Sequence, residues 1–484
     1  MHNENLAAKI LENFPHQATP EQRQVVHLWE DFLLSRDTDR IFVLKGYAGT
    51  GKTSLVAALV KTWTSLQQRV ALLAPTGRAA KVMSDYSGLP AFTIHKFIYR
   101  RKTFGDDEHF TAMPNLVPGT LFLVDEASMI QNYGISGGIF GEGQLLDDLI
   151  RFVYTGRDCR LILIGDEAQL PPVGETESPA LNADNLEGYG LKVTAFTLRQ
   201  VVRQTESSGI LWNATLLRTL LTEGDVFDFP RLRLQGFADI VTVNGNELLE
   251  AMEESYYRVG EDETIVVTRS NKRAALFNQG IRARILDREE ELCSGDRIMI
   301  VKNNYRWMPP PTSKDDPVSS FLANGDMAVV RRFSRVRELY GLRFADAVIE
   351  LPDYNRMEIE ATIILDTLQS ESPALPAERQ KALWNAVWED YDDIPGKKER
   401  MEKMKQDVHL NALQIKYAYA VTCHKAQGGQ WAHVYLDQGY VTEDMLSEDY
   451  FRWLYTALTR ATEKVFLINW PRQQQDVTEE DSDD

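Results

Sequence analysis

Gly46-Tyr47-Ala48-Gly49-Thr50-Gly51-Lys52-Thr53 matches the pattern G-x-x-x-x-G-K-[ST] at every fixed position. Residues 41–44 before it have the length of a buried strand, and residues 54–60 after it are apolar at helical spacing. In this context the glycines let backbone N–H groups turn toward phosphate oxygens, and the start of the helix adds partial positive charge. We therefore predict a nucleotide site that includes Gly49, Thr50 and Gly51, with Lys52 on the β- and γ-phosphates and Thr53 on Mg²⁺.

The composition favours a soluble protein with several domains. A chain of 484 residues has room for domains of about 150 residues each. No apolar run approaches the roughly 18 residues of a membrane helix, and no secretory leader pattern is present, so we expect a cytoplasmic location without membrane contact. The three cysteines have no paired spacing, which argues against a disulfide framework or a zinc site. A net charge of −18 argues against a protein that coats nucleic acid by bulk electrostatics, but it permits a local basic channel.

Two further apolar runs end in polar residues that suit phosphate chemistry. Residues 121–124 lead into Asp125 and Glu126, and this placement assigns Asp125 to Mg²⁺ through the water shell of the ion and Glu126 to the attacking water. Residues 161–164 lead to Gln169, which we expect at the edge of the phosphate site, where an amide can sense the γ-phosphate. Upstream, Gln22 follows the N-cap residue Thr19. Its amide suits either the edge of an adenine or a capping box, and the spacing does not choose between them.

A basic stretch and a break in the strand–helix alternation follow the predicted nucleotide loop. From Arg69 to Lys102 seven Lys and Arg residues stand against one acid, which suits a phosphate backbone, although a solvated charged face is the alternative. His95 in this stretch is most simply a packed histidine. Residues 99–118 suggest a small β-hairpin with Phe104 and Phe110 near its tip, acting as a wedge; a disordered acidic loop is the competing interpretation.

The order of motifs resembles that of superfamily 1 DNA helicases, and within them the RecD and Dda group. The matching strings run along the whole chain: GYAGTGKT, LAPTGRAAKV, TIHKF, LVDEAS, LIGDEAQLPPVG, LRQVVRQ, AVTCHKAQG and LYTALTRA. Any one of these strings can arise by chance, whereas the ordered set is specific.

The resemblance implies an α/β fold with two RecA-like P-loop domains, a β-hairpin inserted in the first, and an SH3-like barrel plus a helical insertion in the second. The implied boundaries are 1–98 and 119–205 for the first RecA-like domain and 99–118 for the hairpin. They are 206–295 and 416–472 for the second RecA-like domain, 296–415 for the barrel with its helical extension, and 473–484 for a disordered acidic tail. We expect Trp384 and Trp388 in the extension to pack against the fold instead of stacking on bases. A cluster of arginines makes the barrel locally basic: Arg331, Arg332, Arg335, Arg337 and Arg343.

The resemblance also implies residue roles. Arg203 and Arg460 match the arginines that reach the γ-phosphate, with a surface salt bridge as the alternative for each, and Gln427 and Gly428 approach the nucleotide. The expected nucleic-acid contacts, from the resemblance and the basic stretch together, are Pro75, Thr76, Arg78, His95, Lys96, Phe104, Phe110, Thr422, His424 and Lys425.

These features together predict an ATP- and Mg²⁺-dependent motor on single-stranded DNA that unwinds duplexes at forks. Movement in the 5′→3′ direction rests on the resemblance alone. We expect a monomer that works with other replication or repair proteins. Three alternatives stay open: an RNA helicase of the same superfamily, a RecD-like motor subunit of a recombination nuclease, and a DNA-binding scaffold with a nucleotide-gated grip.

Overall fold

The structure is a computed structural model that describes residues 6–100, 111–112, 114–132, 144–202, 207–309 and 321–476. Two compact units are present. The first comprises residues 1–242, 426–430 and 440–484, and the second comprises residues 243–425 and 431–439. Within the described ranges, the structure contains no helix that is both long enough and apolar enough to cross a membrane.

The first unit is built on a six-stranded parallel sheet with the strand order β3-β2-β6-β7-β1-β8. Its strands are β1 (Arg40–Gly46), β2 (Arg69–Ala74), β3 (Ala91–Thr93), β6 (Thr120–Val124), β7 (Arg160–Gly165) and β8 (Lys192–Leu198). Because the strands are parallel, their carboxyl ends share one edge, where ligands of open α/β sheets bind. The three strands predicted as buried runs, β1, β6 and β7, lie in the interior of the sheet.

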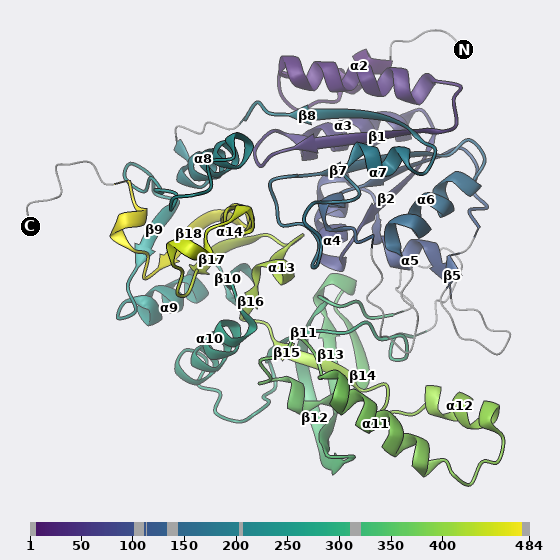
Figure 1. Cartoon of the computed structure of the whole chain (residues 1–484), viewed down its shortest axis with the longest axis vertical. Coiled ribbons are helices and arrows are strands. Elements are labelled where there is room, and N and C mark those ends of the chain that lie inside the picture. Colours follow the sequence, from purple (N-terminus) through teal and green to yellow (C-terminus); the bar gives the residue numbers. More distant parts are fainter. Residues whose placement is uncertain are drawn as a thin grey trace, which may run out of the picture. The chain divides into compact units, whose positions relative to one another are not determined.

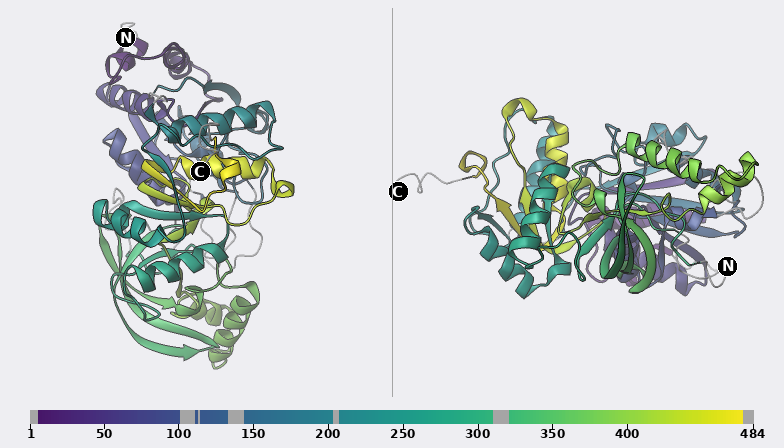
Figure 2. Two further views of the ribbon diagram at one scale, coloured as in Figure 1. Left: turned by 90° about the vertical axis from the view of Figure 1, so that its left-hand side faces the viewer. Right: turned by 90° about the horizontal axis from the view of Figure 1, so that it is seen from below.

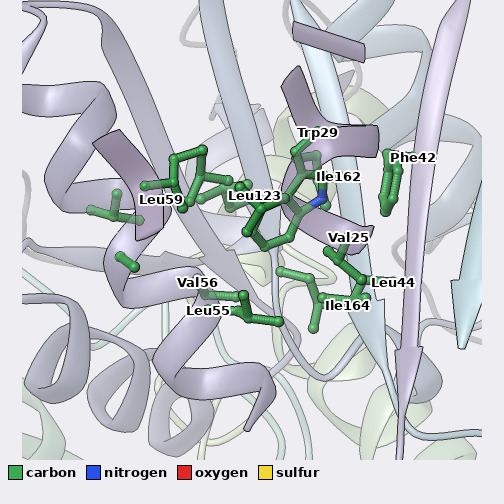
Figure 3. Close-up of a cluster of buried hydrophobic side chains, with 14 of the residues drawn as sticks. Val25, Trp29, Phe42, Leu44, Leu55, Val56, Leu59, Leu123, Ile162 and Ile164 are labelled. Carbon is green, nitrogen blue, oxygen red and sulfur yellow. The ribbon is translucent and has the colours of Figure 1, made fainter. Parts of the chain in front are cut away.

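Helices cover both faces of this sheet (Figure 1). One face carries α1 (Leu6–Glu12), α2 (Pro20–Leu34), α3 (Lys52–Ser65) and α4 (Gly77–Ser87); the other carries α5 (Ile94–Ile98), α6 (Leu145–Thr155) and α7 (Ala183–Glu187). An apolar cluster fills the space between the first group of helices and the sheet, and Figure 3 shows Trp29 of α2 in the middle of this cluster, where its side chain is fully buried. Two apolar layers of this kind fix the sheet, and with it the edge that carries the loops.

A short hairpin follows α5. Strand β4 (Tyr99–Arg100) pairs in antiparallel fashion with β5 (Thr111–Ala112), so the predicted β-hairpin insertion is confirmed at its base. The connecting residues, with Phe104 and Phe110, lie outside the described residues.

The first unit also contains α8 (Gly209–Glu223), the start of β9 (Ile240–Val243), α14 (Glu448–Leu458) and β18 (Ala461–Ile468). Helices α8 and α14 pack together, and Val465 N donates to Asp239 O at 2.8 Å. Leu232 N donates to Gln474 O at 2.9 Å within the turn η7 (Arg472–Gln474), so residues 473–476, predicted as the start of a disordered tail, are part of the fold. The rest of that tail lies outside the described residues.

In the second unit, β10 (Thr264–Thr268) lies between β16 (Ala420–Thr422) and β17 (Trp431–Asp437) and runs parallel to both. The unit also contains α9 (Leu248–Arg258) and α10 (Asn271–Arg284), and α10 packs on β10 and β16. Parallel sheets with flanking helices fit the predicted pair of RecA-like domains.

A closed five-stranded barrel interrupts this sheet between α10 and β16. It consists of β11 (Arg297–Ile300), β12 (Met327–Leu339), β13 (Leu342–Leu351), β14 (Met357–Ile364) and β15 (Leu413–Tyr417), as expected for an SH3-like domain. The long green strands β12 and β13 run side by side in Figure 2.

Between β14 and β15 the chain forms α11 (Ala377–Asp390) and α12 (Lys397–Lys405), the predicted helical insertion (Figure 1). Trp384 and Trp388 stack with ring centroids 5.3 Å apart and pack on the cluster around Leu383, so the packing role expected for both is confirmed.

Candidate nucleotide site

A pocket of about 470 Å³ opens at the carboxyl edge of the sheet in the first unit. It brings together residues that the sequence placed in six separate motifs: Gln22, Gly49, Gly51, Lys52, Thr53, Asp125, Glu126, Gln169, Gly428 and Arg460. Thr50 is fully buried within the same loop.

The glycine loop between β1 and α3 has the backbone that phosphate binding requires. Gly49 and Gly51 have φ angles of +77° and +83°, and a Cβ on Gly51 would lie 2.5 Å from Gln22 Nε2. Lys52 is the first residue of α3, and its Nζ donates to Tyr47 O at 3.0 Å and to Gly46 O. The ammonium is therefore held on the loop itself, at the start of the helix.

Gln22 forms the capping box of α2 and also holds the loop. Its Oε1 accepts the Thr19 N–H at 2.9 Å, and its Nε2 donates to Thr50 O at 3.0 Å. The side chain is 1% exposed. The capping-box interpretation is therefore observed, and contact with an adenine edge stays a prediction.

Two carboxylates follow β6. Asp125 Oδ1 accepts the Glu126 N–H at 2.8 Å, and Asp125 Oδ2 accepts the Tyr86 hydroxyl at 2.7 Å. Glu126 has a φ angle of +52°, an uncommon left-handed conformation for a glutamate. Burial raises the pKa of Glu126, while Arg460 acts in the opposite direction. A raised pKa brings this carboxylate closer to the range in which a base works at neutral pH.

The segment after β7 is tied to residues near the C-terminus. Leu170 N donates to Thr456 Oγ1 at 2.9 Å, and Gln427 Nε2 donates to Leu170 O at 2.7 Å. Among the described residues Gln169 Oε1 has no hydrogen-bond partner, although it is buried. A buried acceptor of this kind at a pocket wall indicates that a polar group binds there.

Arg460 reaches the pocket from the end of α14. Its Nε donates to Thr456 O at 3.0 Å and its Nη1 to Gly429 O at 3.3 Å, and the residue is 3% exposed. This burial excludes the surface salt bridge considered as an alternative. Arg203, the other predicted arginine, lies outside the described residues.

The pocket fits ATP with Mg²⁺ by the chemistry of its lining. Thr53 and Asp125 offer a hydroxyl and a carboxylate, which are the hard oxygen ligands that Mg²⁺ accepts. The described parts of the chain hold no group of three or more His, Cys, Asp or Glu that would bind a metal alone. A site with few protein ligands is typical of Mg²⁺ that binds together with substrate phosphates.

Apart from Phe104 and Phe110, the predicted nucleic-acid contacts of the first unit lie on or directly before two short helices. Thr76 caps α4 by accepting the Ala79 N–H at 3.2 Å, and Pro75 precedes it; Gly428 lies so close that an added Cβ would be 3.0 Å from Thr76 Oγ1. Arg78 Nη2 donates to Gln430 O at 2.7 Å.

On α5, Lys96 Nζ lies 4.7 Å from the centre of the Phe92 ring. Burial lowers the pKa of His95 to about 4, which makes it a neutral residue at physiological pH and agrees with a packed histidine.

The remaining predicted contacts belong to the second unit. Thr422 ends β16, and His424 and Lys425 lie in the following turn α13 (Cys423–Ala426). Thr422 and Lys425 line a small pocket together with Lys416 of β15. Burial lowers the pKa of both lysines to about 8.

Sequence reasoning missed two tyrosines. Tyr455 stands in the string LYTALTRA but received no role, and Tyr86 lies three residues beyond Met83 at the end of a basic helix. Both hydroxyls contact an aspartate that follows a strand. A tyrosine on an otherwise apolar helix face carries no local signal of such a partner, so only the folded structure reveals these contacts.

Comparisons with known proteins agree with the motif order. Residues 17–227 match the family described as an AAA domain, and residues 417–468 match a UvrD-like helicase C-terminal domain. The ATP-dependent RecD2 DNA helicase of Deinococcus radiodurans is 26% identical over 437 residues, covering 88% of this chain and 46% of that protein. The ATP-dependent DNA helicase dda of Enterobacteria phage T4 is 25% identical over 458 residues, covering 88% and 93%. A crystal structure of Pif1 helicase from Bacteroides in complex with ADP-AlF3 and ssDNA aligns over 95% of this chain and 94% of that chain, at 15% identity and a TM-score of 0.46.

Proposed function

We infer that this chain, a RecD/Dda-like superfamily 1 helicase, is an ATP-driven motor that moves 5′→3′ on single-stranded DNA and separates duplexes. The resemblance predicted from the motifs is confirmed by the two matching families and by the RecD2 and Dda relatives. The observation that carries the proposal is the single pocket in which Lys52, Glu126 and Arg460 meet.

The residues of that pocket suit hydrolysis of the γ-phosphate. Lys52 is placed at the loop to bind the β- and γ-phosphates, and Glu126 orients the attacking water and accepts its proton. Arg460 stabilises the charge that develops on the transferred phosphoryl group, an effect that is worth roughly 10³–10⁵ in rate. Thr53 and Asp125 would hold Mg²⁺, which neutralises phosphate charge when it is bound.

Hydrogen bonds within the first unit support coupling between the nucleotide and the DNA strand. Gln427 contacts Leu170 beside the pocket, and the next residue, Gly428, lies against Thr76 at the start of α4. Thr76 is a proposed DNA contact. A change at the phosphate edge therefore has a short route, through one hydrogen bond and one packing contact, to the proposed DNA contact Thr76.

DNA is the favoured nucleic acid because RecD2 and Dda are both DNA helicases by name. We propose single-stranded DNA and forks as partners, with the hairpin at residues 99–118 as the separating element. We further propose a monomer that works beside other replication or repair proteins.

Unwinding of partial duplexes with either a 5′ or a 3′ single-stranded tail tests the proposal, with ATP and Mg²⁺ present. We expect strand separation from the 5′-tailed DNA only, and none with Lys52→Ala. Separation from the 3′ tail alone would overturn the 5′→3′ direction of movement. ATP hydrolysis stimulated by RNA but not by DNA would overturn the choice of DNA as the nucleic acid. Absence of any nucleic-acid-stimulated hydrolysis would overturn the motor itself.

A further inference from the structure

The wall of the nucleotide pocket includes one face of α4. Ala79, Val82 and Tyr86 lie three and four residues apart, so their side chains share a helix face, and all three line the pocket. Tyr86 is the polar member of this face. Its ring packs against the apolar cluster formed by α2, α3 and the sheet.

The Tyr86 hydroxyl makes one contact that bears on the metal site. It donates to Asp125 Oδ2 at 2.7 Å, while Asp125 Oδ1 accepts the Glu126 N–H at 2.8 Å. Each carboxylate oxygen has two acceptor sites, so one site on each oxygen is left for a metal ion or its bound water. The two donors fix the rotation of the carboxylate without using up its acceptor capacity.

Resting on the proposed function, we propose that Tyr86 is a positioning residue that holds Asp125 in the orientation that binds the metal of the metal–nucleotide complex. Residues that hydrogen-bond to a metal ligand fix its orientation, and their loss typically weakens metal binding by 10–100-fold. The Tyr86 ring is partly buried and packs against the apolar cluster, which restrains the position of its hydroxyl. Asp125 has Tyr86 and its own chain neighbour as donors, and Tyr86 is the one that a substitution can remove without moving the backbone.

Binding of Mn²⁺, used as a probe for the Mg²⁺ site, tests this role by electron paramagnetic resonance in the presence of a non-hydrolysable ATP analogue. For Tyr86→Phe we expect the Kd of Mn²⁺ to rise about tenfold. Affinity for the analogue in EDTA should stay within twofold of the wild type, because Tyr86 orients the metal ligand and not the phosphates.

Tyr189→Phe is the matched control. Tyr189 also donates its hydroxyl to a carboxylate, Asp147, but neither residue lines the pocket. This variant should bind Mn²⁺ and the analogue as the wild type does. A double-mutant cycle with Asp125→Asn gives an independent check, because Tyr86→Phe should add little once the carboxylate has been changed.

The outcomes separate this inference from the function on which it rests. If the wild type binds no metal–nucleotide complex, the proposed function fails. If the wild type binds Mn²⁺ and Tyr86→Phe binds it equally well or more tightly, the function stands and the role of Tyr86 is overturned. A lowered melting temperature without a change in Mn²⁺ affinity would likewise overturn it, because it would make Tyr86 a packing residue only.

Discussion

The Tyr455 hydroxyl lies 2.6 Å from Asp166 Oδ2, to which it donates. The same hydroxyl oxygen accepts the Ala48 N–H at 2.8 Å. Tyr455 belongs to α14, Asp166 follows β7, and Ala48 is part of the glycine loop. One buried phenol therefore connects helix α14, which ends two residues before Arg460, with two loops of the nucleotide pocket. Burial raises the pKa of Tyr455 well above its usual value, so the hydroxyl stays protonated and can donate to the carboxylate.

Tyr455→Phe should lower both stability and turnover. The variant leaves the Ala48 N–H and one carboxylate oxygen of Asp166, Oδ2, without the Tyr455 hydroxyl, which costs about 1–3 kcal/mol. We expect kcat for ATP to fall further than nucleotide affinity, because the contact orients the loop and α14 instead of binding phosphate. Thermal unfolding, DNA-stimulated phosphate release and nucleotide titration measure the three quantities.

Tyr154→Phe is the control, because the Tyr154 hydroxyl donates to Arg40 O away from the pocket. This variant should lose stability alone. Equal turnover in the two variants would contradict the connecting role.

Lys52→Ala should stop hydrolysis while leaving DNA binding largely intact. Lys52 starts α3 at the glycine loop and lines the pocket, whereas the proposed DNA contacts lie on other elements. Phosphate release with single-stranded DNA and fluorescence anisotropy of a labelled oligonucleotide measure the two properties. Lys61→Ala removes an exposed lysine from the same helix and should behave as the wild type. Robust DNA-stimulated hydrolysis by Lys52→Ala would disprove the assigned role.

Arg460→Lys should lose most of the turnover despite keeping the charge. A lysine lacks the forked donors that Arg460 directs from a buried position at the pocket, and it cannot contact several phosphate oxygens at once. We expect kcat to fall by about 10³-fold or more, with the KM for ATP changed much less. Arg472→Lys, in the exposed turn near the C-terminus, is the control. A fall confined to KM would show that Arg460 binds ATP without stabilising the transition state.

Local sequence patterns were sufficient to predict most residues of the nucleotide pocket. The strand–loop–helix at residues 41–60 and the acids after β6 lie where the sequence predicts, because the carboxyl ends of parallel strands share one edge. Tyr86 and Tyr455 escaped prediction because their partners come from distant segments, 39 and 289 residues away.

The number of arginines in the barrel predicted its surface less reliably than the apolar runs predicted the strands. The barrel arginines counted as a basic surface are paired with acids in the structure: Arg331 with Glu350, Arg332 with Glu360, Arg335 and Arg337 with Asp346, and Arg343 with Glu291. Register across the barrel strands places Glu350, Glu360 and Asp346 beside their arginines, whereas Glu291 lies before the first barrel strand. A single sequence does not reveal that register, so local excess of one charge did not predict a free basic face.

Stability of the barrel should fall as pH rises through the range in which Asp326 ionises. Burial raises the pKa of Asp326 from 3.8 to about 7. The folded chain therefore binds this proton more tightly than the unfolded chain, and stability is lost between about pH 4 and pH 7, by at most about 4 kcal/mol. Asp326→Asn removes this loss. Its side-chain oxygen can still accept from Ala323 N and the Tyr354 hydroxyl, which both contact Oδ2 at 2.7 Å.

Unfolding midpoints measured at several pH values test this expectation. The midpoint of Asp326→Asn should exceed that of the wild type by an amount that grows up to about pH 7 and then stays constant. Glu358→Gln, an exposed barrel acid, provides the comparison. A difference independent of pH would mean that Asp326 is ionised throughout this range.

Affinity for single-stranded DNA should decrease as pH rises through about 8. Burial lowers the pKa of Lys425 to about 8, and its Nζ contacts Asn324 Oδ1. A protonated ammonium binds a DNA phosphate and a neutral amine does not, so the proposed contact is present below this pH and lost above it. Lys425→Arg stays charged and should bind with little change from pH 7 to 9, while Lys425→Met should bind weakly over the whole range. Removing one phosphate contact should also reduce the dependence of log Kd on log salt by about one.

Lys416→Arg is the matched comparison, because burial lowers the pKa of Lys416 to about 8 in the same small pocket. If the pH dependence disappears in Lys416→Arg and persists in Lys425→Arg, the titrating contact belongs to Lys416 and the role assigned to Lys425 is wrong.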